Sequence, residues 1–358
     1  MPLVCAMEPK RHAVRIEPHA RELRVREDQS ILDAALAAGL NLPHSCKSGH
    51  CGSCIARLRE GEICNPHGQP LGLSAAEAQS GCILLCQAQP RSPVVVEARL
   101  IASVGEVHIK TLPCRIAGMT RLAADVLQVW LRLPAVESLP FRAGQYLDVL
   151  LSGGRRRSFS IASPPHDSGL LELHVRRVPG GGFTSQLFDS LRLDDLLYIE
   201  GPIGQFVLRD SGAPLLMIAG GTGFAPLKSM LRHLLEHGTA RDIHFYWGAR
   251  RAPDLYEDEL LVSWTRQYPQ LHYQAVLSAA TSAQHAHHRL GWVHESVLRD
   301  HPQLGEFDIY AAGPPALIEA VRHEFPAHGA DAARLYFDSF DYAPDAASHA
   351  IRSAAPTT

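Results

Sequence analysis

The stretch Cys-Lys-Ser-Gly-His-Cys-Gly-Ser-Cys, residues 46–54, decides the fold of the first part of this 358-residue chain. It contains Cys46, Cys51 and Cys54, and a fourth cysteine, Cys86, follows after thirty-one intervening residues. Four residues separate the first pair of cysteines and two separate the second pair. The two glycines between the cysteines let the backbone curl tightly and turn its amides toward the sulfurs. The stretch therefore predicts a metal-binding loop.

This spacing is the one that plant-type 2Fe–2S centres use, with three ligands on one loop and a fourth brought back by the fold. We predict that Cys46, Cys51, Cys54 and Cys86 bind such a cluster. A structural zinc site is the alternative, but zinc sites usually have two close Cys-x-x-Cys pairs. A Rieske centre is excluded because no histidine could replace two of these thiolates. Cys82 is the rival fourth ligand, but Cys86, in Cys-Gln-Ala after an apolar run, resembles the fourth-ligand segment of ferredoxins.

The length and composition suggest two or three globular domains. Hydrophobic residues make up 46% of the chain and charged residues 20%, and the net charge is −3. This balance argues against disorder, and the lack of a basic block argues against a nucleic-acid partner. No apolar run approaches the roughly 18 residues that a membrane span needs. Free cysteines and an N-terminus unlike an export signal favour the cytoplasm.

Hydrophobic periodicity divides the chain into three modules joined by one linker and followed by a tail. The first, residues 11–100, has the strand–strand–helix–loop–strand order of a β-grasp ferredoxin domain, and residues 101–112 are expected to be a linker. The expected elements of this module are strands His12–Glu17 and Glu22–Arg26, a helix Ile31–Ala38 capped by Ser30, and a strand Ile55–Leu58.

The second and third modules differ in their element order. Residues 113–212 contain six short strands broken by Gly and Pro, which predicts a six-stranded antiparallel β-barrel. Residues 213–340 alternate strands with helices, which predicts a doubly wound parallel sheet. The tail is residues 341–358. We expect the His-rich stretch 284–288 to be a solvated loop rather than a metal site.

A glycine-rich turn joins the first strand of the third module to its first helix. Such a turn lets a phosphate approach the backbone at a helix N-terminus, although it is not a GxGxxG fingerprint and by itself could serve packing only. The predicted nucleotide-binding residues are Gly220, Gly221, Thr222, Gly223 and Pro226.

Arg157-Ser158-Phe159-Ser160 resembles the flavin-binding Arg-x-Tyr-Ser signature of the ferredoxin–NADP reductase superfamily. The resemblance implies that Arg157 pairs with the flavin phosphate, that Phe159 packs on the ring system, and that the Ser160 hydroxyl approaches flavin N5. Phe159 replaces a tyrosine, so one hydrogen bond to the flavin is lost. His174-Val175-Arg176, followed by Gly180, Gly181 and Thr184, resembles the flavin-pyrophosphate loop of this superfamily. The segment with Gly313 and Pro314 resembles its nicotinamide-side motif, in which Ala312 replaces a cysteine. Phe340 stands where the superfamily often places a residue near the flavin.

The order of the modules resembles the reductase components of bacterial oxygenases and of a deoxysugar dehydrase, the CDP-6-deoxyglucoseen reductases. It implies an NAD(P)H-dependent oxidoreductase in which electrons pass from the nicotinamide through FAD and a 2Fe–2S cluster to an acceptor protein. NADH is favoured over NADPH by the resemblance, although Arg250 and Arg251 could bind a 2′-phosphate. A monomer is expected, because a transient acceptor needs access to the cluster. The alternatives are a reductase of free flavin or small acceptors and an iron–sulfur redox sensor.

Overall fold

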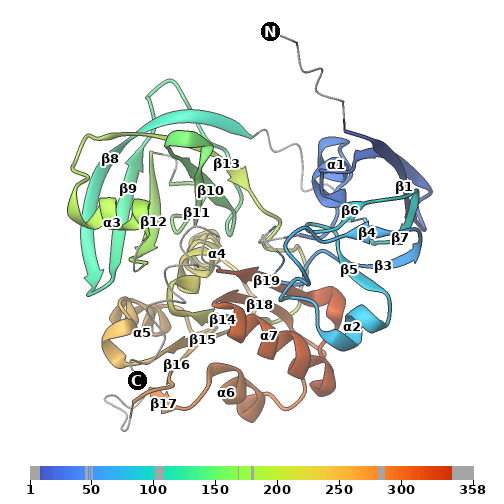
Figure 1. The fold of residues 1–358 in the computed structure, drawn as a ribbon. Helices are drawn as coiled ribbons and strands as arrows, with labels where there is room; N and C mark the ends of the chain where they lie inside the picture. Colours follow the sequence, from blue (N-terminus) through green and yellow to red (C-terminus); the bar gives the residue numbers. More distant parts are fainter. Residues whose placement is uncertain are drawn as a thin grey trace, which may run out of the picture. The chain divides into compact units, whose positions relative to one another are not determined.

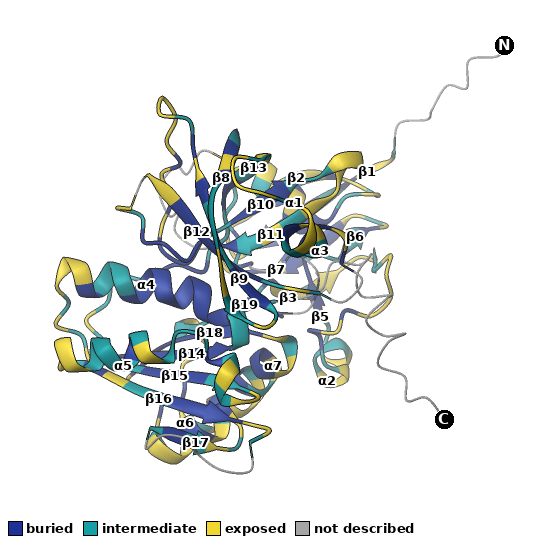
Figure 2. Ribbon diagram, turned by 90° about the vertical axis from the view of Figure 1, so that its left-hand side faces the viewer, coloured by how far each residue is buried: buried dark blue, intermediate teal, exposed yellow. Residues whose placement is uncertain are grey.

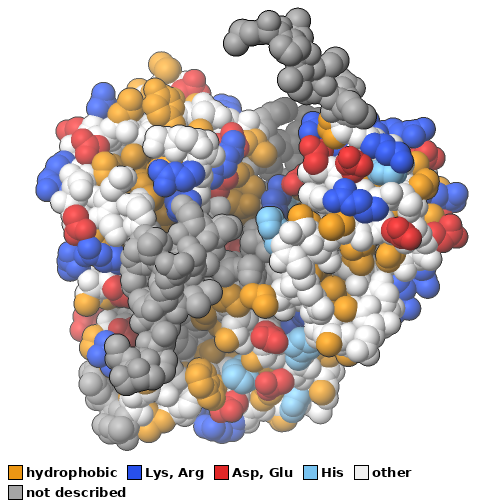
Figure 3. Space-filling view, viewed as in Figure 1, with side chains coloured by type: hydrophobic (Ala, Val, Ile, Leu, Met, Phe, Trp, Pro, Cys, Tyr) orange, Lys and Arg blue, Asp and Glu red, His pale blue; other side chains and the backbone are white. Residues whose placement is uncertain are grey.

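The computed structural model describes residues 9–44, 47, 49, 51–100, 109–167, 169–178, 181–280 and 287–340. Cys46, Gly180 and the predicted tail lie outside the described residues. The chain divides into two compact units, residues 1–106 and 107–358. Within the described residues, no helix is both long enough and apolar enough to cross a membrane. On the face shown in Figure 3, basic and acidic side chains of the described residues are interspersed.

The first unit is built on a five-stranded sheet with the order β2-β1-β7-β3-β5, in which only β1 and β7 pair in parallel (Figure 1). Two helices and a two-stranded ladder of β4 and β6 complete the unit. This is the predicted β-grasp arrangement. Its elements are β1 (Arg11–Glu17), β2 (Arg21–Arg26), α1 (Ile31–Ala37), β3 (Ile55–Glu60), β4 (Ile63–Cys64), α2 (Ala75–Gln79), β5 (Cys82–Leu84), β6 (Gln89–Pro90) and β7 (Val94–Glu97).

Helix α1 begins where the sequence predicts it. The Ser30 side chain accepts a hydrogen bond from the backbone N–H of Asp33 at 3.1 Å, which satisfies one of the unpaired amides of the first turn. The buried residues of α1, including Ile31 and Leu32, belong to the same core as Val14 and Ile16 of β1. The helix thereby covers one side of the sheet.

The second unit begins with a six-stranded antiparallel sheet with the order β11-β10-β13-β8-β9-β12. A bridge between Ile161, directly after β11, and Leu173, within β12, links the two outer strands, so the sheet closes as the predicted barrel. Strand β8 begins at Lys110, within the stretch predicted as linker, because residues 110–112 pair with β13. The elements are β8 (Lys110–Ala123), β9 (Val126–Arg132), β10 (Tyr146–Leu150), β11 (Arg156–Ser160), β12 (Leu170–Arg176), α3 (Gly182–Asp189) and β13 (Leu196–Ile203).

The rest of the unit is a six-stranded parallel sheet with the order β17-β16-β15-β14-β18-β19. Alternate residues of β14 pack into two different cores. Leu215 and Met217 face α4 and α5, whereas Leu216 and Ile218 face α6 and α7. Both faces of the sheet are therefore covered by helices, as predicted (Figure 2). The elements are β14 (Leu215–Gly220), α4 (Phe224–His237), β15 (Ile243–Ala249), α5 (Asp258–Gln267), β16 (Leu271–Leu277), β17 (His288–Leu290), α6 (Val293–Asp300), β18 (Asp308–Gly313), α7 (Pro315–Glu324) and β19 (Leu335–Ser339).

The prediction of a solvated loop at residues 284–288 is wrong at His288. His288 begins β17, pairs with Ala275 and is buried. The rings of His287 and His288 both contact the Asp258 carboxylate, at 2.8 and 3.1 Å. The carboxylate compensates the desolvation of the rings, and this is a tertiary contact that local sequence does not encode. Residues 284–286 lie outside the described residues.

Candidate functional site

The cysteine loop brings buried sulfurs together in the first unit. Cys51, Cys54 and Cys86 expose only 2%, 3% and 7% of their surface, and the thiols of Cys54 and Cys86 are hydrogen-bonded. The backbone N–H of Ser53 points at the Cys51 sulfur, at 3.4 Å. Cys46, the remaining predicted ligand, lies outside the described residues. The folded chain thus places three of the four predicted ligands in one cluster.

The donor set fits an iron–sulfur cluster. The hydrogen bond to Cys86 raises the pKa of the Cys54 thiol, and burial and the neighbouring sulfurs raise it further. Several buried thiols side by side are a poor environment for thiolate charge, and a bound metal centre replaces their protons. The segment after Cys86 is tied to the loop, because the Gln87 amide donates to the Lys47 carbonyl at 3.1 Å. A Cβ on Gly49 would lie 2.8 Å from the Gln87 side chain, so this position needs glycine.

Cys82 occupies a different environment. It lies on β5 opposite Arg57, and its sulfur is 3.5 Å from the hydroxyl of Ser80. The Cys86 sulfur instead contacts Cys54. This arrangement favours Cys86 over Cys82 as the fourth ligand.

The flavin signature lies on β11. Ser160 is buried, and Phe159 is half-buried with its ring centroid 5.8 Å from that of Phe183 on α3. Arg157 is half-buried, whereas Ser158 is exposed and its hydroxyl donates to Asp148 at 2.6 Å. The alternating strand therefore presents an aromatic ring and a cation on one side, which suits a planar, phosphate-bearing cofactor.

His174 and Val175, predicted near the flavin pyrophosphate, are buried in β12. The His174 ring nitrogens contact the Glu172 carboxylate and the Tyr256 hydroxyl, each at 3.0 Å. Its ring also stacks on Phe224, the first residue of α4, with centroids 6.0 Å apart. The structure therefore places His174 in the contact between the barrel and the nucleotide domain.

The other predicted residues of this segment surround the start of α3 and the glycine turn. A Cβ on Gly221 would lie 3.1 Å from the Arg176 guanidinium, so the guanidinium lies next to the glycine-rich turn. Gly181 precedes α3, and the buried Thr184 hydroxyl accepts a hydrogen bond from the N–H of Val178 at 3.1 Å. Thr184 thus holds the loop, whereas Arg176 is placed to meet an anion.

The glycine-rich turn follows β14 and leads through a short 3-10 turn, Gly221–Gly223, into α4. Gly221 has φ +53°, and its carbonyl accepts a hydrogen bond from the Trp247 indole at 2.9 Å. A Cβ on Gly223 would lie 2.0 Å from the carbonyl oxygen of Ala312. The backbone amides of Thr222 and its neighbours precede α4, where the helix dipole favours an anion. Pro226 fits in the first turn of α4, where its missing N–H is not needed.

Strands β14 and β18 are neighbours although they are distant in the sequence. A Cβ on Gly220 would lie 2.7 Å from the ring of Pro314, and Gly313 has φ +147°. The N–H of Phe340 donates to the Gly313 carbonyl at 2.8 Å. The chain reverses its direction of winding between these two strands, and ligands of open parallel sheets bind at such a point. The glycine turn, the Gly313–Pro314 segment and Phe340 thus meet at one edge.

Sequence reasoning missed Asp338. This buried residue pairs with Ala312 in the sheet, and its carboxylate Oδ2 accepts a hydrogen bond from the Ser160 hydroxyl at 3.4 Å. The only local signal is an acidic residue that follows three large apolar ones, and this pattern does not by itself mark a buried position.

Sequence reasoning also missed a buried ion network between the barrel and α4. The Lys228 ammonium lies 2.9 Å from Glu172 and 2.8 Å from Glu257. Burial raises the pKa of the Glu172 carboxyl, but hydrogen bonding to His174 and the charge of Lys228 outweigh it and lower this pKa to about 2. A charged carboxylate therefore persists in the domain contact.

Comparison with known families assigns each module. Residues 14–91 match the 2Fe-2S iron-sulfur cluster binding domain, residues 113–208 the oxidoreductase FAD-binding domain, and residues 217–323 the oxidoreductase NAD-binding domain. The chain thus carries domains for all three predicted cofactors.

Related proteins share the whole arrangement. The CDP-6-deoxy-L-threo-D-glycero-4-hexulose-3-dehydrase reductase of Yersinia pestis is 37% identical over 87% of this chain and 93% of its own length. Terephthalate 1,2-dioxygenase reductase component 1 of Comamonas sp. is 35% identical over 88% and 93%. The crystal structure of the Amycolatopsis cytochrome P450 reductase GcoB has 32% identity and a TM-score of 0.70, covering 92% of this chain and 98% of that one. The chain therefore belongs to the flavin- and iron–sulfur-dependent NAD(P)H reductases of the ferredoxin–NADP reductase superfamily, which pass electrons to a separate acceptor protein.

Proposed function

We propose that this reductase takes hydride from NADH at the β14–β18 edge and supplies single electrons to one acceptor enzyme. The observation that supports it is the meeting of the Ser160 hydroxyl, from the flavin signature, with Asp338, the strand neighbour of Ala312. Residues predicted for the flavin and for the nicotinamide thus lie at one edge of the sheet, as hydride transfer requires.

The chain's own residues would bind and orient the cofactors. The α4 N-terminus would hold the phosphates of the nicotinamide nucleotide, Arg157 and Arg176 would pair with the flavin phosphates, and Phe159 would pack on the ring. Ser160 would donate a hydrogen bond toward flavin N5 and not act as a strong base, because an unassisted hydroxyl is a poor one. When bound, the flavin supplies the conversion from a two-electron donor to the one-electron 2Fe–2S cluster.

The donor is proposed to be NADH. Arg250 and Arg251 follow β15 and are exposed, at the place where ribose is usually bound. The Arg251 guanidinium lies 3.8 Å from Asp254, which reduces its availability to a 2′-phosphate. Equal rates of flavin reduction with NADH and NADPH would contradict this choice.

The acceptor is proposed to be either an oxygenase component or a sugar-nucleotide dehydrase, the partners that the names of the relatives indicate. We also propose that the protein is a monomer. We propose a reducing, cytoplasmic location because the described cysteines are free thiols.

Anaerobic NADH should bleach both flavin and cluster bands, and adding each purified acceptor should restore the bands only with the true partner. Cys51→Ala should abolish reoxidation by the acceptor yet spare flavin reduction. Unbleached bands would instead indicate a sensor.

A further inference from the structure

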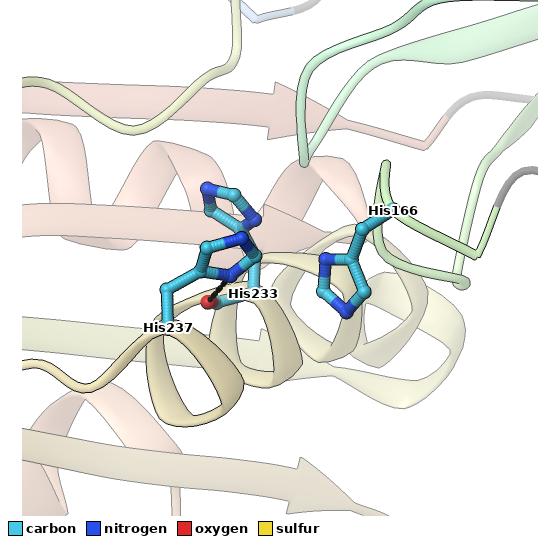
Figure 4. A group of neighbouring side chains, drawn as sticks. All are labelled: His166, His233 and His237. Carbon is cyan, nitrogen blue, oxygen red and sulfur yellow. Dashed lines mark hydrogen bonds between the residues drawn. The ribbon is translucent and has the colours of Figure 1, made fainter.

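Three histidines meet at the C-terminal end of α4, away from the residues assigned to the flavin and the nucleotide. His233 and His237 lie one turn apart on this helix, and His166 comes from the loop between β11 and β12 (Figure 4). Each ring offers a nitrogen, and these three nitrogens all lie within 4.8 Å of one another. Two ligands at i and i+4 on one helix face are a common way for a protein to present imidazoles to a metal.

The rings of His237 and His166 each use one nitrogen in a hydrogen bond, so the other nitrogen of each ring keeps a free lone pair. The Nδ1 of His237 lies 2.9 Å from the His233 backbone carbonyl, which can only accept, so Nδ1 carries the proton and Nε2 is the free acceptor. The Nε2 of His166 contacts the Glu236 carboxylate, which leaves Nδ1 as the free nitrogen. Metal-binding histidines characteristically donate their other N–H to a carbonyl or a carboxylate.

The third ring is half-buried, and one of its nitrogens lacks a hydrogen bond. The Nδ1 of His233 is inaccessible to solvent and makes no hydrogen bond within the described part of the chain. A ring nitrogen without a hydrogen bond keeps a lone pair that a metal ion can accept.

The surrounding charges also suit a cation. Glu236 is held by the Arg232 guanidinium at 2.9 Å, and Arg232 also contacts Asp167 at 3.0 Å. The two carboxylates outnumber the one guanidinium, so this group of three side chains carries a net negative charge. The last turn of α4 adds the negative end of the helix dipole.

We propose that His166, His233 and His237 form a site for a divalent transition-metal ion of the zinc–copper class, with Glu236 orienting His166. Three imidazoles and an open fourth position are a donor set that such ions accept. Metal–nitrogen bonds of about 2.0–2.1 Å require the nitrogens to approach to roughly 3.3 Å, a small rotation for rings that include two exposed ones. The ion would tie the barrel loop to α4, beside the existing hydrogen bond from Ser229 to the Ser163 carbonyl.

The test uses tag-free holoprotein with flavin and cluster in place, washed with chelator. Calorimetric titration with Zn²⁺ should show one site per chain. His166→Gln and His237→Gln should each weaken binding at least tenfold. His272→Gln is the matched control, because His272 belongs to a different group with Asp242 and should leave the affinity unchanged. Electron paramagnetic resonance of the oxidised protein with one equivalent of Cu²⁺ should show coupling to several nitrogens, reduced in His166→Gln.

Three outcomes would overturn the site. One is the absence of stoichiometric Zn²⁺ binding. Another is an affinity that falls in His272→Gln but not in His166→Gln, which would move the ion to the Asp242 group. The third is loss of the visible cluster bands in step with added metal, which would mean that Zn²⁺ replaces iron at the cysteines. His166 is exposed, so its replacement should not prevent folding.

Discussion

The hydroxyl of Ser160 donates to the carboxylate of Asp338 across 3.4 Å, and both residues are buried. Ser160 ends a barrel strand and Asp338 lies in the last strand of the parallel sheet. This hydrogen bond joins the two domains at the edge where the predicted flavin and nicotinamide residues meet. Because the hydroxyl carries a single proton, donation toward flavin N5 would replace the bond to Asp338.

Replacing Ser160 with alanine should slow flavin reduction by NADH at least about tenfold, which is roughly 1.4 kcal/mol of activation free energy. The lost hydrogen bond orients the flavin but does not hold it, so the flavin content should stay unchanged. Stopped-flow absorbance at saturating NADH measures the rate. Ser263→Ala is the control, because that hydroxyl only donates to a carbonyl within α5. An unchanged rate in Ser160→Ala would contradict the role of this hydroxyl.

Cys86→Ser should abolish the visible bands of the 2Fe–2S cluster, whereas Cys82→Ser should retain them. The reason is that the Cys86 sulfur contacts the Cys54 thiol. Cys82, the first residue of β5, instead has its sulfur beside the hydroxyl of Ser80. Absorbance and iron content of the purified proteins are the measurements. A cluster that survives in Cys86→Ser and disappears in Cys82→Ser would assign the fourth ligand to Cys82.

Gly223→Ala should weaken NADH binding at least tenfold and destabilise the second unit by about 1–3 kcal/mol. The added methyl would lie 2.0 Å from the Ala312 carbonyl oxygen, which is backbone and cannot rotate away. Gly212→Ala is the matched control, since its Cβ would meet nothing within 4 Å. The KM for NADH and the unfolding midpoint followed by tryptophan fluorescence test this. All four tryptophans lie between residues 130 and 292, so the signal reports this unit alone.

Acid should destabilise the contact between the barrel and the nucleotide domain. The pKa of Glu172 is lowered from 4.5 to about 2, so folding is favoured by the charged carboxylate. The stabilisation is complete above the unfolded value and is lost as the pH falls from about 4.5 to about 2, on the order of 3 kcal/mol in all.

Glu172→Gln tests this pH dependence. The variant should be less stable at pH 7, because the Lys228 charge loses one of its two partners. Its unfolding free energy should depend less on pH below about 4.5, as measured by urea titrations with tryptophan fluorescence. A slope as steep as that of the wild type would show that other carboxylates carry the acid sensitivity.

Local patterns were sufficient for most elements. Buried and more exposed residues alternate along β1, and Ser30 caps α1, so both elements were predicted within one residue. Strands β7 and β19 were missed because Val94–Glu97 and Leu335–Ser339 are short and become strands by pairing with distant partners. Helix α7 was missed because it begins directly after Pro314, without a side-chain cap that would mark its start.

The sequence alone determined the cofactor chemistry and the order of the domains, because cysteine spacing, a glycine turn and the Arg157–Ser160 signature are local features that each depend on a few neighbouring residues. Only the tertiary structure decided that Ser160 meets Asp338, that His174 serves the domain contact, and that His166 joins His233 and His237. These contacts join residues that are 178, 82 and roughly 70 positions apart. Contacts at such separations depend on strand pairing and domain packing, which no short stretch of sequence specifies.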